Sequence, residues 1–461
     1  RNQTANQGNL RKLYAYASDA DKANLERQFA GIDWEELPAI IENYVLSRPK
    51  TDIPSDLSPA PFFPFPAKTP EQKELYSRAT ELGERMLREG KVACLTVAGG
   101  QGTRLGFDGP KGTYPITPVL GKTLFQYFAE SIARVSEKHG RPLLWFVMCS
   151  ELNYEATRSF FEKHGDFGLA KGQVNFFVQG TMPAIGLDGK LIAASKDSLA
   201  LAPNGHGGTL LALRKSGCLD KMKNAGVECL SYFQVDNPLV PVADPLFLGL
   251  HALERSQMSS RMLPKTGPFE KLGNFCMTGG RLQIIEYSDM PTELAERKKA
   301  DGTLDFLAGS PAIHVIDVAF IESLTADGRL SLPWHRADKK VPYLAPDGTI
   351  VKPESPNAVK VESFIFDALP LAERVMVLEG AREEIFGPTK NATGVDSAES
   401  CRAMLVARDI RRMRLAGMQA EDGAIVEISP RCVVDDADAI AYFKENPATP
   451  VAAGERKAFG K

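Results

Sequence analysis

The chain has 461 residues, of which 43% are hydrophobic, enough to fill at least one large core within two or three domains. This composition excludes a disordered or fibrous protein. The 55 basic and 58 acidic side chains leave a formal net charge of -3, so the chain has no bulk basic field and nucleic acid is not expected as its main partner.

Residues 33–47 carry the first clear helix pattern, DWEELPAIIENYVLS. Asp33 and Glu36 have the spacing of a capping box, and apolar residues follow at helical intervals. Six prolines between Pro54 and Pro70 then indicate an extended linker. We therefore expect residues 1–65 to form an N-terminal helical segment followed by a proline-rich linker.

A layered α/β domain is expected over residues 66–395. Residues 71–89 are typical of a helix ended by Gly90, and residues 91–97 of a short strand. Strand-like runs (PLLWFVMC, VNFFV, CLSYFQV, RLQIIEY) then alternate with helix-like runs (TLFQYFAESIARVSEK, PLFLGLHALERS), which favours a mainly parallel sheet. A helical stretch at 402–414 and the segment EDGAIVEISPRCVV predict a small C-terminal domain over 396–461.

Seven cysteines are scattered along the chain without a CxxC pair: Cys94, Cys149, Cys218, Cys229, Cys276, Cys401 and Cys432. Most lie in apolar runs, so we expect small buried side chains in a reducing compartment. The sequence has neither a signal-peptide pattern nor an uninterrupted apolar stretch of about 18 residues. It therefore favours a cytoplasmic protein without membrane contact.

The segment 98–112 is the main candidate for a phosphate-binding loop, because a strand leads directly into the glycine-rich run AGGQGTRLG. Missing side chains let backbone N–H groups approach a nucleotide, and glycine permits the positive φ of a tight anion-binding turn. Arg104 and Lys111 add positive charge, which a triphosphate needs because phosphates about 4 Å apart repel by about 4 kcal/mol. The spacing matches neither GxGxxG nor GxxxxGK[ST]. A plain glycine turn with incidental cations is the alternative.

Asp236 ends the apolar run YFQVD, which places its carboxylate at the ligand-binding edge of an open α/β sheet. Mg²⁺ commonly takes one or two carboxylates together with phosphate oxygens, so Asp236 is the candidate metal ligand. The alternative is a strand-end aspartate that caps the turn with Asn237 and Pro238.

A second glycine-rich turn, PNGHGG at 203–208, is too polar for a core and suits contact with a base or ribose. His206 within it is alternatively a surface turn residue. The six histidines form no HxH or HExxH pattern and no GxSxG elbow occurs, so zinc hydrolysis and serine acyl transfer find no support.

These segments resemble the uridylyltransferases of the UDP-N-acetylglucosamine pyrophosphorylase type, within the wider UTP:sugar-1-phosphate uridylyltransferase family. The resemblance covers about Leu10 to Pro430 and rests on GGQGTRLG with PKG, FFVQGTMPA, APNGHGG, QVDNPLVPVADPLFLG, IEYSDM, FLAGSPAIH, KKVPY, KVESFIFD and FGPTKNA. It implies a Rossmann-like, GT-A-like catalytic domain with a helical N-terminal part and a small C-terminal domain. It also implies UTP, a sugar 1-phosphate and Mg²⁺ as requirements.

The resemblance further implies roles for individual residues. Catalytic cations would be Arg104, Lys111 and Lys390. The nucleotide would be bound by Ala98, Gly99, Gly100, Gln179, Gly205, His206, Asp236 and Lys360, with Gln179 and Gly205 selecting uracil and Asp236 holding the metal. The sugar would be bound by Gly273, Glu286, Tyr287, Ser310, Phe364 and Phe366. Alternation in a buried strand would explain Phe364 and Phe366 without function, and a solvated surface position would explain Lys390.

The chain departs from the family pattern at two turns. Where the family has AGN this chain has Gly309-Ser310, and where the family has GNGG it has GHGG around His206. The hydroxyl of Ser310 reaches less far than an amide. The identity of the sugar therefore stays open, with N-acetylglucosamine 1-phosphate as the leading candidate and glucose 1-phosphate or galactose 1-phosphate as alternatives.

The implied reaction is in-line attack of the sugar-phosphate oxygen on the α-phosphorus of UTP, with release of pyrophosphate and without a general base. A non-catalytic UDP-sugar-binding regulator is an alternative of another class, and the joint presence of Arg104, Lys111, Asp236 and Lys390 speaks against it. A dinucleotide-dependent oxidoreductase fits the glycine spacing poorly. We expect a monomer or a weak homo-oligomer.

Overall fold

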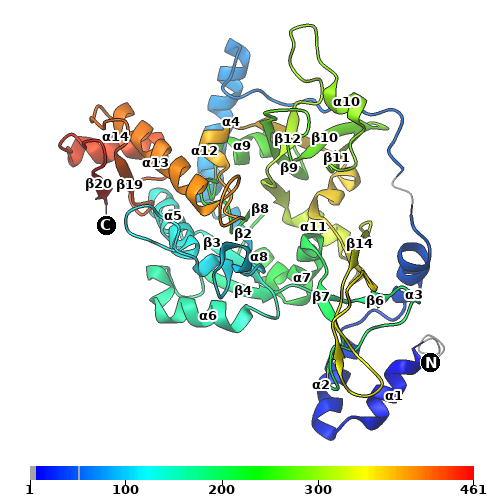
Figure 1. Ribbon diagram of the computed structural model, residues 1–461. Helices are drawn as coiled ribbons and strands as arrows, with labels where there is room; N and C mark the ends of the chain where they lie inside the picture. Colours follow the sequence, from blue (N-terminus) through cyan, green and yellow to red (C-terminus); the bar gives the residue numbers. More distant parts are fainter. Residues whose placement is uncertain (1–6, 50–51, 461) are drawn as a thin grey trace. The chain divides into compact units, whose positions relative to one another are not determined.

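The computed structural model describes residues 7–49 and 52–460 (Figure 1). The chain divides into two compact units that are each built from separate stretches of sequence. The small unit comprises Arg1–Ile53, Gln179–Ala212 and Leu330–Ala368, and the large unit comprises Pro54–Val178, Leu213–Arg329 and Leu369–Lys461. The division into three consecutive domains that the sequence suggested stays a prediction.

The large unit is organised around one mixed sheet with the strand order β1-β10-β12-β9-β13-β8-β2-β3-β4, in which β11 also pairs with β10 and β18 with β9. The central pairs β8–β2, β2–β3 and β3–β4 are parallel, and so is the pair β18–β9. Strand β13 pairs antiparallel with β8 and β9, β12 pairs antiparallel with β9 and β10, and β10 pairs antiparallel with β11. The predicted α/β class with a mainly parallel mixed sheet is confirmed. The strands are β1 Ser58–Pro59, β2 Val92–Val97, β3 Leu144–Cys149, β4 Val174–Val178, β8 Cys229–Gln234, β9 Met258–Pro264, β10 Gly273–Thr278, β11 Arg281–Ile285, β12 Ala308–Ser310, β13 His314–Asp317 and β18 Val375–Glu379.

Helices complete the large unit; α4 and α5 begin within one residue of the predicted position, whereas α13 begins four residues before the predicted stretch at 402–414. Thr69 forms a capping box with Gln72 at the start of α4, and Gly90 follows the helix with φ +70. The helices are α4 Pro70–Arg88, α5 Leu124–His139, α6 Tyr154–Lys163, α8 Cys218–Asn224, α9 Pro245–Leu253, α10 Thr292–Glu296, α11 Val318–Leu324, α12 Arg382–Ile385, α13 Ala398–Leu415 and α14 Asp436–Glu445, while α7 Thr209–Lys215 begins in the small unit.

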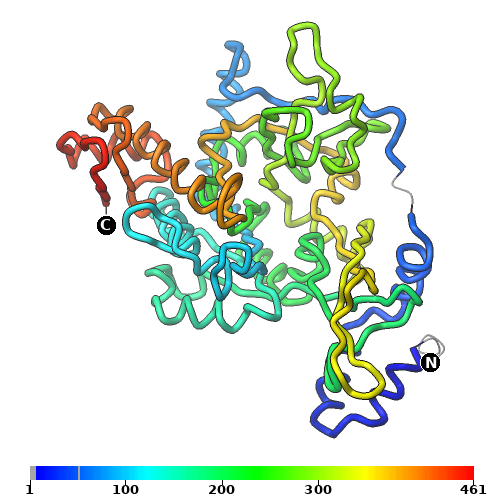
Figure 2. Tube along the Cα trace, viewed as in Figure 1, coloured from blue at the N-terminus to red at the C-terminus, as the bar shows by residue number. Residues whose placement is uncertain are grey.

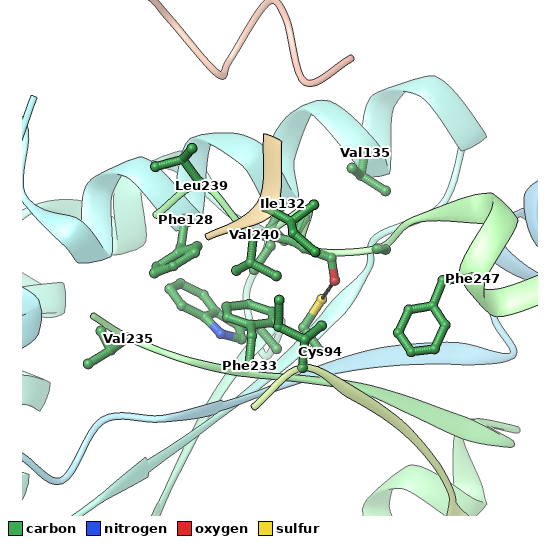
Figure 3. Packing of buried hydrophobic residues seen from close by; sticks show 14 of the residues in the cluster. Cys94, Phe128, Ile132, Val135, Phe233, Val235, Leu239, Val240 and Phe247 are labelled. Carbon is green, nitrogen blue, oxygen red and sulfur yellow. Dashed lines mark hydrogen bonds between the residues drawn. The ribbon is translucent and has the colours of Figure 1, made fainter. Parts of the chain in front are cut away.

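The core of the large unit gathers aromatic and aliphatic side chains from the sheet and its helices (Figure 3). Phe128 of α5 meets Phe233 of β8 with ring centroids 4.9 Å apart. In the same core the thiol of Cys94 donates to the carbonyl of Val242 at 3.2 Å. Six of the seven cysteines are buried and Cys432 is half-buried, which agrees with the expectation of small apolar side chains.

The C-terminal elements have a core of their own, formed by α13, α14 and the parallel pair β19 Ile425–Ile428 and β20 Arg456–Phe459. These elements lie together in Figure 1. Met413 of α13 and Phe443 of α14 are fully buried in this core. Helix α13 also bonds to the segment before α5, because Arg402 donates to the carbonyls of Pro115 at 2.8 Å and Ile116 at 3.1 Å.

The small unit collects three chain segments, which Figure 2 traces in blue, green and yellow. Strand β17 Ala358–Glu362 lies between β14 His335–Lys339 and β6 Ile185–Gly186, with both pairs antiparallel. The remaining elements are α1 Gly8–Tyr16, α2 Asp19–Ala30, α3 Leu37–Ile40, a π-helix Ile41–Leu46, and the strand pairs β5 Thr181–Pro183 with β7 Leu201–Pro203 and β15 Tyr343–Leu344 with β16 Ile350–Val351.

The capping box predicted at Asp33 is only half formed. The Asp33 carboxylate accepts from the backbone N–H of Glu35 at 3.0 Å and of Glu36 at 3.1 Å, but these residues lie in a turn and the helix begins at Leu37. A short polar side chain stabilises a turn by such bonds as readily as it starts a helix. Over residues 7–49 and 52–460, the structure contains no helix long and apolar enough to cross a membrane. A cytoplasmic location stays a prediction.

Candidate active site

The segment 98–112, here called the glycine loop, leaves the end of β2 and folds back on itself. The N–H of Ala98 donates to Met148 at 2.8 Å, and the N–H of Lys111 donates to the carbonyl of Gly100 at 3.0 Å. The buried side chain of Asn153 then donates to the carbonyls of Ala98 at 3.0 Å and Gly100 at 3.3 Å. Asn153 was not identified from the sequence, because no motif marks an asparagine that braces a loop distant in sequence.

Only some glycines of this loop have the roles predicted for them. Positive φ occurs at Gly106 (+69) and Gly109 (+134), and not at the three glycines that directly follow β2. A Cβ atom on Gly112 would lie 2.1 Å from the ring of Phe125, so this glycine is required by packing. A Cβ atom on Gly100 would meet nothing within 4 Å among the described residues. Gly100 therefore leaves open space where a ligand can approach the backbone.

Lys111 lies close enough to Asp236, Lys390 and Arg104 for their charges to act on it, and we call these four residues the cation cluster. Burial lowers the pKa of Lys111, the nearby charge of Asp236 opposes this shift, and the positive charges of Lys390 and Arg104 reinforce it. Lys390 and Arg104 therefore each lie close enough to Lys111 to repel it. Such a concentration of positive charge with one carboxylate favours a polyanion that is accompanied by a divalent cation.

Asp236 lies just beyond β8 and is 8% exposed. The turn that follows is held by Asn237, whose amide donates to Ile385 at 2.8 Å and accepts from the N–H of Gly387 at 2.9 Å. The N–H of Thr389 donates to the carbonyl of Asp236 at 2.8 Å. The turn is thus held by Asn237 and does not depend on the Asp236 carboxylate, whose charge acts on Lys111.

Lys390 belongs to residues 387–397, here called the lysine loop. Asp396 lies in this loop, burial raises the pKa of its carboxyl group, and the charge of Lys390 opposes that shift. Asp396 and Asn391, which follows Lys390 directly, were not among the site residues predicted from the sequence. Lys390 is partly buried within the cluster and is not a fully solvated surface residue.

The small unit brings together the residues expected at the uracil and ribose. The amide of Gln179 donates to the carbonyl of Gly205 at 2.7 Å. His206 is partly buried and its Nδ1 accepts from the N–H of Ile365 at 3.0 Å, so it is not a free surface residue. Burial, and then the neighbouring His335, lower the pKa of His206 to about 4, so its ring is neutral near pH 7 with the proton on Nε2.

An aromatic stack formed by His206, Phe364 and His335 lies in the same unit. The Phe364 ring is 5.3 Å from that of His206 and 4.1 Å from that of His335, nearly parallel to both. Phe366 lies 5.2 Å from Phe364. The alternative of a buried strand is wrong here, because β17 ends at Glu362 and a 3₁₀ helix runs over Ile365–Leu371. Lys360 lies on β17 in this unit, and its phosphate contact stays a prediction.

The expected sugar contacts of the large unit meet at the ends of three strands. Gly273 on β10 pairs with Ser310 on β12. A Cβ atom on Gly273 would lie 3.8 Å from Oε1 of Glu286 and 4.0 Å from Cβ of Ser310, so these three residues share one corner. The Ser310 hydroxyl accepts from the N–H of Ala312 at 3.3 Å, and Tyr287 is 44% exposed. Their roles as sugar contacts stay predictions.

The comparisons with known proteins agree with this geometry. Residues 62–420 match the family described as "UTP--glucose-1-phosphate uridylyltransferase". The chain is 37% identical over 381 residues to "UDP-N-acetylhexosamine pyrophosphorylase-like protein 1" of Xenopus tropicalis, covering 79% of this chain and 75% of that protein. It is 32% identical over 398 residues to "UDP-N-acetylglucosamine pyrophosphorylase" of Saccharomyces cerevisiae, covering 84% of this chain and 83% of that protein.

Among solved structures, the uridine diphosphate N-acetylglucosamine pyrophosphorylase from Trypanosoma brucei is similar in fold. Its TM-score is 0.80 at 24% identity, and the match covers 98% of this chain and 97% of that chain.

Proposed function

The chain belongs to the UTP--glucose-1-phosphate uridylyltransferase family, which makes it a nucleotidyltransferase, and we propose N-acetylglucosamine 1-phosphate as its sugar substrate. Such an enzyme forms a UDP-sugar and pyrophosphate from UTP and a sugar 1-phosphate. The choice of sugar is supported by the relatives from Xenopus and yeast, whose names specify N-acetylhexosamine and N-acetylglucosamine.

The observation that carries the assignment of the site is the cation cluster. Lys111 and Arg104 come from the glycine loop, Lys390 from the lysine loop, and Asp236 from the end of β8. In the proposed reaction these cations bind the triphosphate and the sugar phosphate, whose mutual repulsion would otherwise oppose attack on the α-phosphorus. A sugar phosphate is already ionised near pH 7, so orientation and charge neutralisation suffice and no general base is needed.

The donor set fits Mg²⁺ as the metal of this reaction. The described residues contain no group of three or more His, Cys, Asp or Glu side chains arranged to hold a metal ion. Mg²⁺ does not need such a cage, because it binds to one or two carboxylates and completes its coordination with phosphate oxygens and water. Asp236 would hold the ion, and when bound it would neutralise charge on the phosphates.

The proposal is tested by measuring pyrophosphate release with UTP, Mg²⁺ and each of N-acetylglucosamine 1-phosphate, glucose 1-phosphate and galactose 1-phosphate. We expect the highest kcat/KM with N-acetylglucosamine 1-phosphate and no release after chelation of the metal. A preference for another sugar would reject the proposed substrate. Binding of UDP-N-acetylglucosamine without any pyrophosphate release would instead support the non-catalytic regulator.

A further inference from the structure

Asn391 of the lysine loop has a side chain that is bonded at both ends. Its Nδ2 donates to the carbonyl of Val395 at 2.8 Å, and its Oδ1 accepts from Nη2 of Arg104 at 2.7 Å. The first bond fixes the plane of the amide, and the second then determines where the guanidinium lies. Asn391 is therefore the contact through which the lysine loop reaches the glycine loop.

The backbone of the lysine loop keeps Asn391 in place. The carbonyl of Asp396 accepts from the N–H groups of both Lys390 at 2.7 Å and Asn391 at 2.9 Å. Asp396 itself has φ +53, in the left-handed region that aspartate adopts more readily than most residues other than glycine. Two consecutive residues, the lysine and the asparagine, are thus fixed by one carbonyl group.

We propose that Asn391 is a positioning residue that holds Arg104 toward the triphosphate. Arg104 is exposed and its long side chain has many rotamers, so holding it before the ligand arrives reduces the entropy lost on binding. The inference rests on the proposed function, since it assumes that Arg104 contacts the phosphates of UTP and of the product pyrophosphate.

The chemistry of an amide suits this task better than that of a carboxylate. An aspartate at position 391 would also accept from Arg104, but its negative charge would offset the positive charge that the phosphates need. The neutral oxygen of Asn391 orients the guanidinium and leaves its charge available. Asn391→Asp is therefore expected to weaken pyrophosphate binding at least as much as Asn391→Ala, and the difference should shrink at high salt.

The test is a double-mutant cycle on the full-length chain, with inorganic pyrophosphate as the probe and its Kd measured by calorimetry in the presence of Mg²⁺. Asn391→Ala is expected to raise the Kd about fivefold, a loss typical of the net contribution of one hydrogen bond. In the Arg104→Ala background the same substitution should change the Kd less than twofold. In turnover, the KM for UTP should rise while the KM for the sugar 1-phosphate stays within about twofold.

Asn446→Ala is the matched control, because Asn446 is exposed on the end of α14 and donates to the carbonyl of Tyr442 at 2.9 Å. It should leave the Kd unchanged. An equal loss in both Arg104 backgrounds would show a purely structural role for Asn391, and no loss in either would also overturn the proposal. If Asn391→Ala lowers the thermal midpoint, Asn391→Ser, which keeps an acceptor oxygen, must restore part of the binding.

The cycle separates this inference from the proposed function. Absence of pyrophosphate release with every sugar phosphate would refute the proposed reaction, while the binding cycle would still report whether residues 104 and 391 act together. If Arg104→Ala by itself leaves pyrophosphate binding unchanged, Arg104 does not contact the phosphates and the role proposed for Asn391 is overturned.

Discussion

Two glycine-rich turns, one in each unit, use the same residue for opposite purposes. In the glycine loop, a Cβ atom at Gly100 would enter open space, so the absent side chain leaves room for a ligand. In the PNGHGG turn, a Cβ atom at Gly205 would lie 2.2 Å from the carbonyl of Ser363, so the absent side chain lets two backbone segments touch. The two regions also differ in charge, since Lys111 lies near Arg104, Lys390 and Asp236 whereas burial keeps the ring of His206 neutral near pH 7.

The largest effect is expected from removing the carboxylate of the charged region. Asp236→Asn keeps the size of the side chain but loses the charge that holds a divalent cation, so kcat should fall at least about 1000-fold, or roughly 4 kcal/mol of transition-state stabilisation. Turnover and thermal midpoint should be measured together. The exposed Asp220→Asn serves as control, and near-normal turnover of Asp236→Asn would remove Asp236 from the metal site.

Lys390→Ala removes a cation from the same region without creating a buried cavity. We expect kcat/KM to fall about 100-fold, and the KM for the sugar 1-phosphate to rise more than that for UTP. Initial-rate measurements with each substrate varied in turn provide the check. Equal changes in both KM values would assign Lys390 to the triphosphate instead.

A matched pair of alanine substitutions tests the difference between the two turns directly. Gly205→Ala should lower the free energy of unfolding by about 2–4 kcal/mol, because the residue has φ +85 and its Cβ would collide with Ser363. Gly100→Ala should leave stability within about 1 kcal/mol and raise the KM for UTP. Chemical denaturation and initial rates measure the two effects, and a reversed pattern would contradict the proposed reason for each glycine.

The smallest expected effect concerns the pH dependence of stability. The pKa of His206 falls from 6.5 to about 4 on folding, so between these values the unfolded chain binds a proton that the folded chain does not. The stability contributed by neutral His206 is therefore present above pH 6.5 and is lost as the pH falls, by about 2 kcal/mol at pH 5. Urea denaturation at pH 7 and pH 5 should show this loss, and His206→Asn should lack it. An unchanged loss in the variant would assign the titration to another group.

The sequence predicted those features that depend on local pattern. The run of β2 and the end of α4 at Gly90 are set by neighbouring residues, so a short apolar run and a helix-ending glycine were enough to predict them. Such local signals do not reveal which distant segments of the chain pair with one another. Strand β17 pairs with β6 and β14, which are distant in sequence, and Asn153 donates to a loop residue 53 positions away. No local sequence pattern indicates either contact.

The same distinction between local patterns and distant contacts explains which residues of the candidate site were predicted. Asp236 was foreseen because a carboxylate at a strand end has a recognisable place in an α/β sheet. Asn391 was not, because its importance comes from one bond to Arg104, 287 residues earlier in the chain. The conformation of the glycine loop was only partly foreseen, since glycine content does not specify which residues take positive φ.

Helix α13 joins the lysine loop to the end of the chain. It begins directly after Ser397, whose hydroxyl accepts from the N–H of Ser400 at 3.1 Å, and Met413 near its other end is buried in the C-terminal core. The carboxylate of Asp409 also accepts from the N–H of Ile428 at 2.9 Å. Shortening the chain from its C-terminus would unpack this helix. A deletion far from Lys390 in sequence would therefore disturb the lysine loop and lower the activity of the enzyme.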